Sequence, residues 1–314
     1  MQTHFEKRAL AAPDRILVAT DLSDTEYLVP HAIAQAKASG AQVTLIHALP
    51  PSDVVPMDAA TIPYVDKIKI VRDLRVVLLG LAREFESRGI PCESAVRDGD
   101  PADVIPQEIN RTHATRLIIG SHGRGRLGQL TLGSVARDLV PAVNIPVFVV
   151  GPHAQTGVRH ATPQRILHPV SLGFNYRESL HLALDIAQVY RAELILLHVL
   201  DPDVAEKVDP QRTIDWADDA LRALIPDASK LAPPVRTTVV SGKLAEVILK
   251  TSNQTKADWI VLGADGAPRG WPFHQSVAYK VLSAASCPVI TLRHERARNE
   301  NAVDFKEVHF TSYS

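Results

Sequence analysis

Residues 116–150 read RLIIGSHGRGRLGQLTLGSVARDLVPAVNIPVFVV, and their pattern of apolar residues and glycines indicates the class of fold. An apolar run ends in a glycine-rich loop, which leads to Gly133, Ser134 and a helical segment as far as about Val143. A second apolar run starts at Ile145. Glycines let a backbone approach a phosphate closely, while free N–H groups and the dipole at a helix start favour negative charge. The order of strand, glycine loop, helix and strand therefore predicts an anion-binding turn in an α/β protein.

Two common nucleotide-binding motifs are excluded by the same stretch and by the rest of the chain. Residues 123–128 satisfy G-x-G-x-x-G, but a dinucleotide fingerprint opens a helix at once and has an acidic residue about 20 positions further on. Here residues 130–132 intervene before the helix, and Asp138 comes too soon. The G-x-x-x-x-G-K-[ST] phosphate loop does not occur, because Leu244 follows Gly242 and Lys243.

The glycine loop resembles the signature of the universal stress protein family, which is Gly, two residues, Gly, nine residues, then Gly followed by Ser or Thr. Four residues match this signature without a gap: Gly120, Gly123, Gly133 and Ser134. Three further matches are Asp21 after the first apolar run, His47 at the end of the second, and residues 99–101 (Gly-Asp-Pro) before a helical segment. Together the matches cover most of residues 14–150.

The composition of the chain is that of a globular protein. Its 314 residues suit two domains of about 150 residues each, with 46% hydrophobic and 22% charged residues. A formal net charge of −1 gives no electrostatic reason to expect nucleic acid or an anionic membrane. Cys92 and Cys287 lie far apart without metal-ligand spacing, which suits a reducing compartment. Neither a signal peptide nor a membrane-spanning run is recognisable, so we expect a cytoplasmic location.

The first half of the chain alternates between short apolar runs and amphipathic segments. The expected strands are residues 15–19, 43–49 and 92–97. Three helices are expected: one that ends near Ser39, before Gly40, and two that span 66–88 and 101–112. Residues 50–63 form a proline-bearing loop. In the 66–88 helix, apolar residues recur at a spacing of three and four, which predicts a face packed into the core: Ile68, Val71, Leu74, Val77, Leu78, Leu81 and Phe85.

This alternation predicts an α/β fold with a mostly parallel sheet covered on both faces. The family resemblance implies a five-stranded, doubly wound, Rossmann-like sheet of the adenine nucleotide α hydrolase type. Ligands of such sheets bind beyond the carboxyl ends of the strands, where the strand order reverses. By the same resemblance the first and fourth strands are neighbours at that point, so Asp21 and the loop after Gly120 should face one crevice.

The second half of the chain repeats the first with a period of about 145 residues. Residues 165–167 repeat 15–17, and residues 194–199 (LILLHV) repeat 43–48 (VTLIHA). Repetition at this length indicates two tandem copies of a whole domain rather than a solenoid. We therefore expect a first domain over 1–150, a linker over 151–163, a second domain over 164–294 and a tail over 295–314.

The two copies differ where ligand chemistry is expected. Ser171 replaces Asp21, and in the shorter second loop Gln275 stands where Gly133 would. Asp265 would repel a phosphate by like charge. Bulky or proline side chains would also crowd a polyphosphate, and prolines remove N–H donors: Pro268, Trp271, Pro272 and Phe273. Domain 2 is therefore not expected to hold ATP in the way that domain 1 does, although Trp271 and Phe273 could cap an apolar pocket or form packing contacts.

The resemblance implies a set of nucleotide contacts in domain 1. Asp21 should meet the adenosine end, Ala48 the adenine, and Ile119 and Gly120 the base and ribose. The residues expected at the phosphates are His122, Gly123, Gly133, Ser134 and Val135. Several have plainer interpretations that stay open. Asp21 could be a helix N-cap, the glycines could only form turns, and His122 could be a surface residue. Arg124 and Arg126 could reach distal phosphates or simply be solvated, and His47 and His198 are more typical of structural histidines.

The predicted function is ATP binding, with or without Mg²⁺, by domain 1 of a tandem universal stress protein that acts in regulation. The alternatives are a slow ATP hydrolase or nucleotide transferase, and a nucleotide-independent scaffold that binds another ligand or protein through domain 2. Because the sequence shows neither paired carboxylates near the loop, metal-ligand spacing nor a G-x-S-x-G motif, binding is favoured over catalysis. The family's fifth strand commonly pairs with that of a partner domain, which implies an internal pseudo-dimer through residues 145–150 and 289–293. Two such chains could associate further as a homodimer.

Overall fold

The structure is a computed structural model and describes residues 12–50, 67–121, 132–151, 154, 162–172, 176–202, 210–225, 233–265 and 276–294. Several expectations lie outside these residues. They concern the 50–63 loop beyond residue 50, most of the linker, the tail and the glycine loops of both domains. The glycine-loop residues that the structure does not describe include His122, Gly123, Arg124, Arg126, Trp271, Phe273 and Gln275. Among the described helices, none combines the length and hydropathy that crossing a bilayer requires.

Strands and helices alternate through both halves of the chain. The first half contains β1 (Arg15–Ala19), α2 (Thr25–Ser39), β2 (Gln42–Leu49), α3 (Lys67–Glu86), β3 (Cys92–Asp98), α4 (Pro101–Thr112), β4 (Arg116–Gly120), α5 (Ser134–Leu139) and β5 (Val147–Val150). The second half contains β6 (Arg165–Pro169), α6 (Arg177–Tyr190), β7 (Glu193–Leu200), α8 (Pro210–Ala223), β8 (Val235–Ser241), α9 (Leu244–Thr255), β9 (Trp259–Asp265), α10 (Val277–Ala284) and β10 (Val289–His294).

Helix ends follow their local sequence signals. Gly40 ends α2 in the left-handed conformation, at φ 72°, as its position predicts. The expected extension of the helix after Ser134 to about Val143 is wrong, because α5 stops at Leu139. Pro141 has no N–H to donate to the preceding turn, so the helix cannot continue through it. Residues 140–142 instead form turns.

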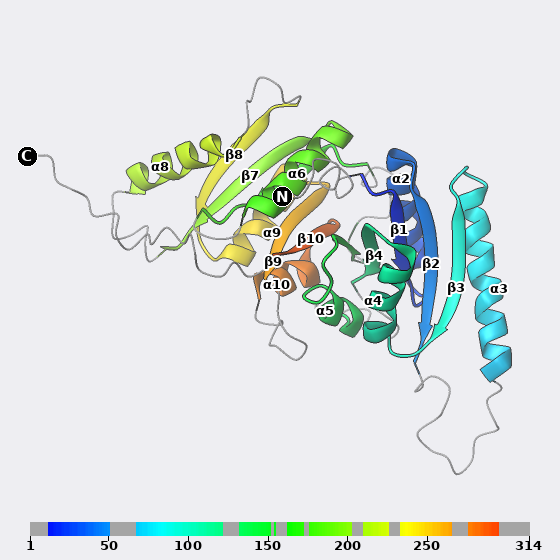
Figure 1. Ribbon diagram of the computed structural model, residues 1–314. Coiled ribbons are helices and arrows are strands. Elements are labelled where there is room, and N and C mark those ends of the chain that lie inside the picture. The colour runs from blue at the N-terminus through cyan, green and yellow to red at the C-terminus, as the bar shows by residue number, and fades with distance from the viewer. Residues whose placement is uncertain are drawn as a thin grey trace, which may run out of the picture.

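All ten strands form one sheet, in the order β3-β2-β1-β4-β5-β10-β9-β6-β7-β8 (Figure 1). The strand pairs within each half are parallel, whereas β5 and β10 pair antiparallel in the middle, with Phe148 opposite Ile290. The expected pairing of the two fifth strands within one chain is therefore confirmed. It joins the halves into a continuous sheet and leaves β3 and β8 as its two edges.

Each face of the sheet has its own hydrophobic core. Leu28 of α2, Leu78 of α3, Leu180 of α6 and Leu221 of α8 belong to one core cluster. The other core cluster contains buried residues of the remaining long helices and of α5: Ile105, Leu139, Ile248 and Val281. The helices thus cover both faces, and α5 follows β4 on the face opposite to the one that carries α2. Chain segments that leave neighbouring strands toward opposite faces create the crevice at which α/β proteins bind ligands.

An aromatic cluster joins the two halves beneath α2 and α6. Phe148 of β5 and Trp259 of β9 make an edge-to-face contact with ring centroids 5.0 Å apart, and Tyr190 of α6 contacts Trp259 at 5.1 Å. His31 lies against the other side of Phe148, at 5.7 Å. Trp259 and Phe148 are fully buried. The two halves therefore share one core and are not merely tethered.

The predicted core-facing stripe of α3 is only partly correct. Leu78 and Phe85 are buried, but Ile68 is 80% exposed and Val77 is 50% exposed. The physical reason is the position of the helix. It packs mainly on β3, which is an edge strand (Figure 1), so only a narrow flank of α3 can reach the sheet.

Candidate functional site

A pocket lies at the carboxyl ends of β1 and β4, which are parallel neighbours. Its volume is about 100 Å³. The whole empty space around it, including the part that is open to solvent, is about 560 Å³. Seven of the nine residues predicted as nucleotide contacts lie on its wall: Asp21, Ala48, Ile119, Gly120, Gly133, Ser134 and Val135. The other two, His122 and Gly123, lie outside the described residues. The fold therefore brings residues from four distant parts of the sequence to one place.

The loop between β1 and α2 forms one side of the pocket and is held by its own side chains. Asp21 accepts hydrogen bonds from the Ser23 N–H and hydroxyl, at 2.9 and 2.6 Å. Leu22 takes a left-handed conformation at φ 69°, which costs roughly 1–2 kcal/mol for a residue with a Cβ. Its N–H donates to the Thr20 hydroxyl oxygen at 2.9 Å. The N-cap of α2 is Asp24, so the alternative interpretation of Asp21 as that cap is wrong.

Asp24 is a pocket residue that the sequence analysis missed. Only 3% of its surface is exposed, and its carboxylate accepts a hydrogen bond from the Thr20 hydroxyl. Burial raises the pKa of Asp24 to about 6, against the lowering effect of the Thr20 hydrogen bond, and the nearby charge of Asp21 adds to the rise. No signal in the sequence marks it, because its burial depends on contacts that exist only in the folded sheet.

Gly120 is required by its contact with Asp24. A Cβ added to Gly120 would lie 2.3 Å from the Asp24 Oδ2 atom, well inside van der Waals contact. The glycine therefore permits a close approach at the pocket wall and is more than a turn residue. Gly133 has an ordinary φ of −60°, and its N–H donates to the Ser121 carbonyl at 2.7 Å. That bond joins the two ends of the glycine loop at its base.

The start of α5 supplies the polar side of the pocket. Ser134 is exposed there, and the N–H groups of the first helical turn have no acceptor within their own helix. With six residues, α5 is shorter than expected, so its dipole contributes little and the hydroxyl and N–H groups matter more. Among the described residues, no group of three His, Cys, Asp or Glu side chains is placed to hold a metal ion.

The two strand-end histidines have the same structural role in the two domains. The Nδ1 atom of His47 lies 2.9 Å from the Thr20 carbonyl oxygen, and that of His198 lies 2.9 Å from the Val170 carbonyl oxygen. His47 is 4% exposed. Each ring ties the end of the second strand to the loop after the first. The contacts support the interpretation of these histidines as structural.

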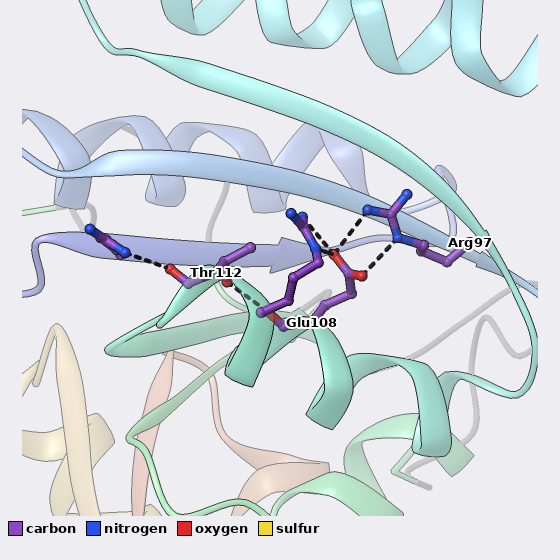
Figure 2. Close-up of polar contacts among 5 residues, drawn as sticks. Arg97, Glu108 and Thr112 are labelled. Carbon is purple, nitrogen blue, oxygen red and sulfur yellow. Dashed lines mark hydrogen bonds and ion pairs between the residues drawn. The ribbon is translucent and has the colours of Figure 1, made fainter.

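An ion cluster fixes α4, whose first turns reach the pocket through Pro101 and Ile105. Figure 2 shows Glu108 between arginines of β3 and α4. Arg97 Nε lies 2.7 Å from Oε1 and Arg111 Nη2 lies 2.8 Å from Oε2. Burial alone would raise the pKa of Glu108, but the hydrogen bonds from Arg111 and Arg97 outweigh it and lower the pKa. The cluster thus locks the helix that carries one pocket wall onto the neighbouring strand.

Comparison with known proteins identifies the class. The model of the universal stress protein family matches residues 13–151 and again 163–293. The chain belongs to the universal stress protein family and contains two such domains in tandem.

Individual relatives agree with this assignment. A Thermus aquaticus universal stress protein is 32% identical over 137 residues, 43% of this chain and 96% of that protein. A universal stress protein A-like protein of Arabidopsis thaliana is 37% identical over 62 residues, only 35% of its length. The crystal structure of a universal stress protein from Archaeoglobus fulgidus superposes with a TM-score of 0.69 at 20% identity, over 90% of this chain and 99% of that one. Another universal stress protein was solved in complex with cAMP; it covers 45% of this chain and 98% of its own, at 21% identity and a TM-score of 0.34.

Proposed function

We propose that domain 1 binds an adenine nucleotide, with ATP as the first candidate, and that the chain acts in regulation as a nucleotide-binding universal stress protein. The observation that carries the proposal is the pocket at the ends of β1 and β4. The described residues of the glycine signature, Gly120, Gly133 and Ser134, share this pocket with Asp21. Residues that match a sequence signature can lie in separate turns of a structure. Here they line the same pocket.

The groups around the pocket fit the parts of an adenine nucleotide. Ala48, Ile105 and Ile119 give an apolar wall of the kind that a purine base requires. The Asp21 carboxylate can accept hydrogen bonds from ribose hydroxyls, because ionised carboxylates act only as acceptors. Ser134 and the N–H groups beside it are donors, which is what phosphate oxygens need. The bare backbone at Gly120 leaves room for the close approach of a ligand.

A charge placed at the phosphate side tests the proposal. Ser134→Asp should weaken ATP binding at least tenfold, by like-charge repulsion, while the affinity for uncharged adenosine changes little. The matched control is Ser276→Asp, which adds the same charge at the start of the corresponding helix of domain 2 and should leave both affinities unaltered. Isothermal titration with and without Mg²⁺ measures the affinities.

Three further results would count against the proposal. Equal ATP affinity in Ser134→Asp and the unmodified protein would place the phosphates elsewhere. Loss of ATP binding in Ser276→Asp would assign the site to domain 2. Absence of binding of ATP, ADP, AMP, cAMP and adenosine to the unmodified protein would remove the proposed function. Release of inorganic phosphate from ATP, measured on the same preparation, distinguishes a binder from a hydrolase.

A further inference from the structure

Asp24 is an acidic group in a place where an anionic ligand is expected. It lies on the wall of the domain 1 pocket with Asp21 and Gly120, and it is 97% shielded from solvent, being 3% exposed. The family signature that led to Gly120 and Asp21 does not include it. Since carboxylates are almost never fully buried unless they are paired, its position calls for a physical account.

The carboxyl group of Asp24 is held in position by neighbouring groups. The Thr20 hydroxyl donates to Oδ1, and the same hydroxyl oxygen accepts the Leu22 N–H at 2.9 Å. On the other side, Oδ2 is so near Gly120 that a Cβ there would lie 2.3 Å away. The Thr20 hydrogen bond thus holds the carboxyl at the pocket wall, with Oδ2 beside the end of β4.

The described surroundings of Asp24 give it no positive partner. Its own loop contributes Asp21, whose negative charge opposes ionisation, and α2 contributes Tyr27, whose pKa rises to about 12 through burial and the charges of Asp24 and Asp21. From β2, the His47 ring is directed to the Thr20 carbonyl oxygen. Helices α4 and α5 present uncharged residues to the pocket: Pro101, Ile105, Ser134, Val135 and Ala136.

We propose that the protonation state of Asp24 sets the affinity of domain 1 for the charged part of a nucleotide, with tight binding when the carboxyl is neutral and weak binding when it is ionised. Ionised, the carboxylate adds to the charge of Asp21 and repels a phosphate in a low-dielectric pocket. Neutral, it repels nothing, and its O–H can donate to a ligand oxygen. The proposal rests on nucleotide binding by this pocket and adds a proton dependence to it.

The pH range of the effect follows from the burial of Asp24. Because its pKa is raised to about 6, the carboxyl changes charge between pH 5 and 7 and not near pH 4 as an exposed aspartate would. Nucleotide affinity should therefore rise as pH falls through this range. A suitable ligand is cAMP, because its phosphodiester keeps one negative charge throughout, whereas the terminal phosphates of AMP and ATP titrate in the same range.

The experiment is a titration of the full-length protein with cAMP and with adenosine at several pH values from 5 to 8. We expect cAMP affinity to increase about tenfold from pH 7.5 to pH 5.5, which corresponds to about 1.4 kcal/mol, while adenosine affinity stays within threefold. Asp24→Asn should bind cAMP at pH 7.5 as tightly as the unmodified protein does at pH 5.5, without pH dependence. Asp21→Asn is the matched control and should keep the pH dependence.

A second variant keeps the test decisive if Asp24→Asn folds poorly. Thr20→Val places the residue of domain 2, Val170, at the corresponding position of domain 1. It removes a hydrogen bond that lowers the pKa of Asp24, so the midpoint of the cAMP pH profile should move to higher pH.

The outcomes separate this proposal from the nucleotide-binding function. A cAMP affinity that is flat with pH in the unmodified protein, or a pH dependence that survives in Asp24→Asn, overturns the role of Asp24 and leaves nucleotide binding intact. If neither cAMP, ATP nor adenosine binds at any pH, nucleotide binding itself is refuted, and the proton dependence falls with it.

Discussion

The two domains have the same backbone fold but differ in the side chains at the positions that line the pocket of domain 1. In both, a strand-end histidine contacts the carbonyl after the first strand, as described for His47 and His198. In both, a threonine at the end of the helix after the third strand (α4 or α9) bonds back one turn. The Thr112 hydroxyl donates to the Glu108 carbonyl at 2.7 Å, and the Thr255 hydroxyl donates to the Thr251 carbonyl at 2.8 Å. These repeated contacts serve the fold and say little about function.

The differences concern side chains that can ionise or donate. Val170 stands in domain 2 where domain 1 has Thr20, and the N-cap of α6 is Tyr176 where that of α2 is Asp24. At the helix after the glycine loop, domain 1 has Gly133 as N-cap, without a side chain to bond. Domain 2 has Ser276, whose hydroxyl accepts the Tyr279 N–H at 3.0 Å. The helix start in domain 2 is therefore satisfied by its own residue, which is a stabilising solution.

The comparison teaches that a shared frame does not imply a shared site. Domain 1 has a buried carboxyl group, a strained backbone at Leu22 and a helix start without a side-chain cap, and each of these reduces stability. Domain 2 has residues that pack or cap at the corresponding positions. Such local costs are typical of functional sites. Four variants test this contrast.

The largest effect should come from Trp259→Ala, which tests whether the two domains are one folding unit. Truncating this fully buried side chain should lower the free energy of unfolding by about 3–5 kcal/mol. Because Trp259 contacts Phe148 of domain 1 and Tyr190 of domain 2, urea denaturation followed by circular dichroism should show one transition at lower urea. Trp216→Ala is the control, with a change within about 0.5 kcal/mol, since Trp216 is 52% exposed. Two separate transitions in the unmodified protein would contradict a shared core.

Asp24→Asn should stabilise the protein at neutral pH. The pKa of Asp24 is raised from 3.8 to about 6, so the folded state disfavours its ionised form, and stability is lost as pH rises through this interval. Removing the charge should regain up to about 3 kcal/mol at pH 7 and almost nothing at about pH 3, where the carboxyl is mostly protonated in both states. Denaturation at about pH 3 and pH 7 measures both values. A gain of equal size at the two pH values would attribute the effect to packing rather than charge.

Gly120→Ala should weaken nucleotide binding at least tenfold, or by about 1.4 kcal/mol. The added methyl group would displace the Asp24 carboxyl from its position and into the pocket. Titration with cAMP measures the loss, and Gly263→Ala at the equivalent position of domain 2 should show none. Combining Gly120→Ala with Asp24→Ala should restore part of the affinity. A double variant no better than Gly120→Ala alone would mean that the methyl group itself, and not the displaced carboxyl, blocks the ligand.

Glu108→Gln should have the smallest effect, a loss of about 1 kcal/mol at pH 7, because Arg97 and Arg111 are partly exposed and solvent screens their interactions with Glu108. The pKa of Glu108 is lowered in the folded state, so its contribution is present above the ordinary value of 4.5 and disappears as pH falls below it. Domain 2 has Val240 and Thr251 at the equivalent positions. At pH 7 the double variant Arg97→Val with Glu108→Thr should therefore lose less stability than Glu108→Gln. Thermal denaturation of the two variants measures this, and a lower melting temperature for the double variant would show that the ion cluster is essential.

Much of the fold could be predicted from local sequence. The strand at residues 15–19, the stop at Gly40 and the helix at 101–112 depend on short-range propensity and capping, which sequence records directly. The pairing of β5 with β10 was also predictable, but only because of the family resemblance. The exposure of Ile68 and Val77 was not predictable, since periodicity shows that a helix has an apolar face and not how wide a sheet lies beneath it.

The candidate site was predictable to the extent that backbone signals define it. The glycine signature and Asp21 led to residues that do lie around one pocket. Asp24 was missed because its burial depends on Gly120, which is 96 positions away in the sequence, and on the strained turn at Leu22. A contact of that kind exists only after the sheet has formed, so no spacing along the chain records it.

The antiparallel junction of β5 with β10 has a consequence for communication between the two halves. Strands of the second half run opposite to those of the first, so the carboxyl ends of β1 and β4 and those of β6 and β9 lie along opposite rims of the sheet. A molecule bound at the ends of β6 and β9 would therefore not block the pocket at the ends of β1 and β4, and it would not contact a ligand in that pocket. The contact between Phe148 and Trp259 lies between the two rims, in the core that both halves share, so a structural change at one rim could reach the other only through that core.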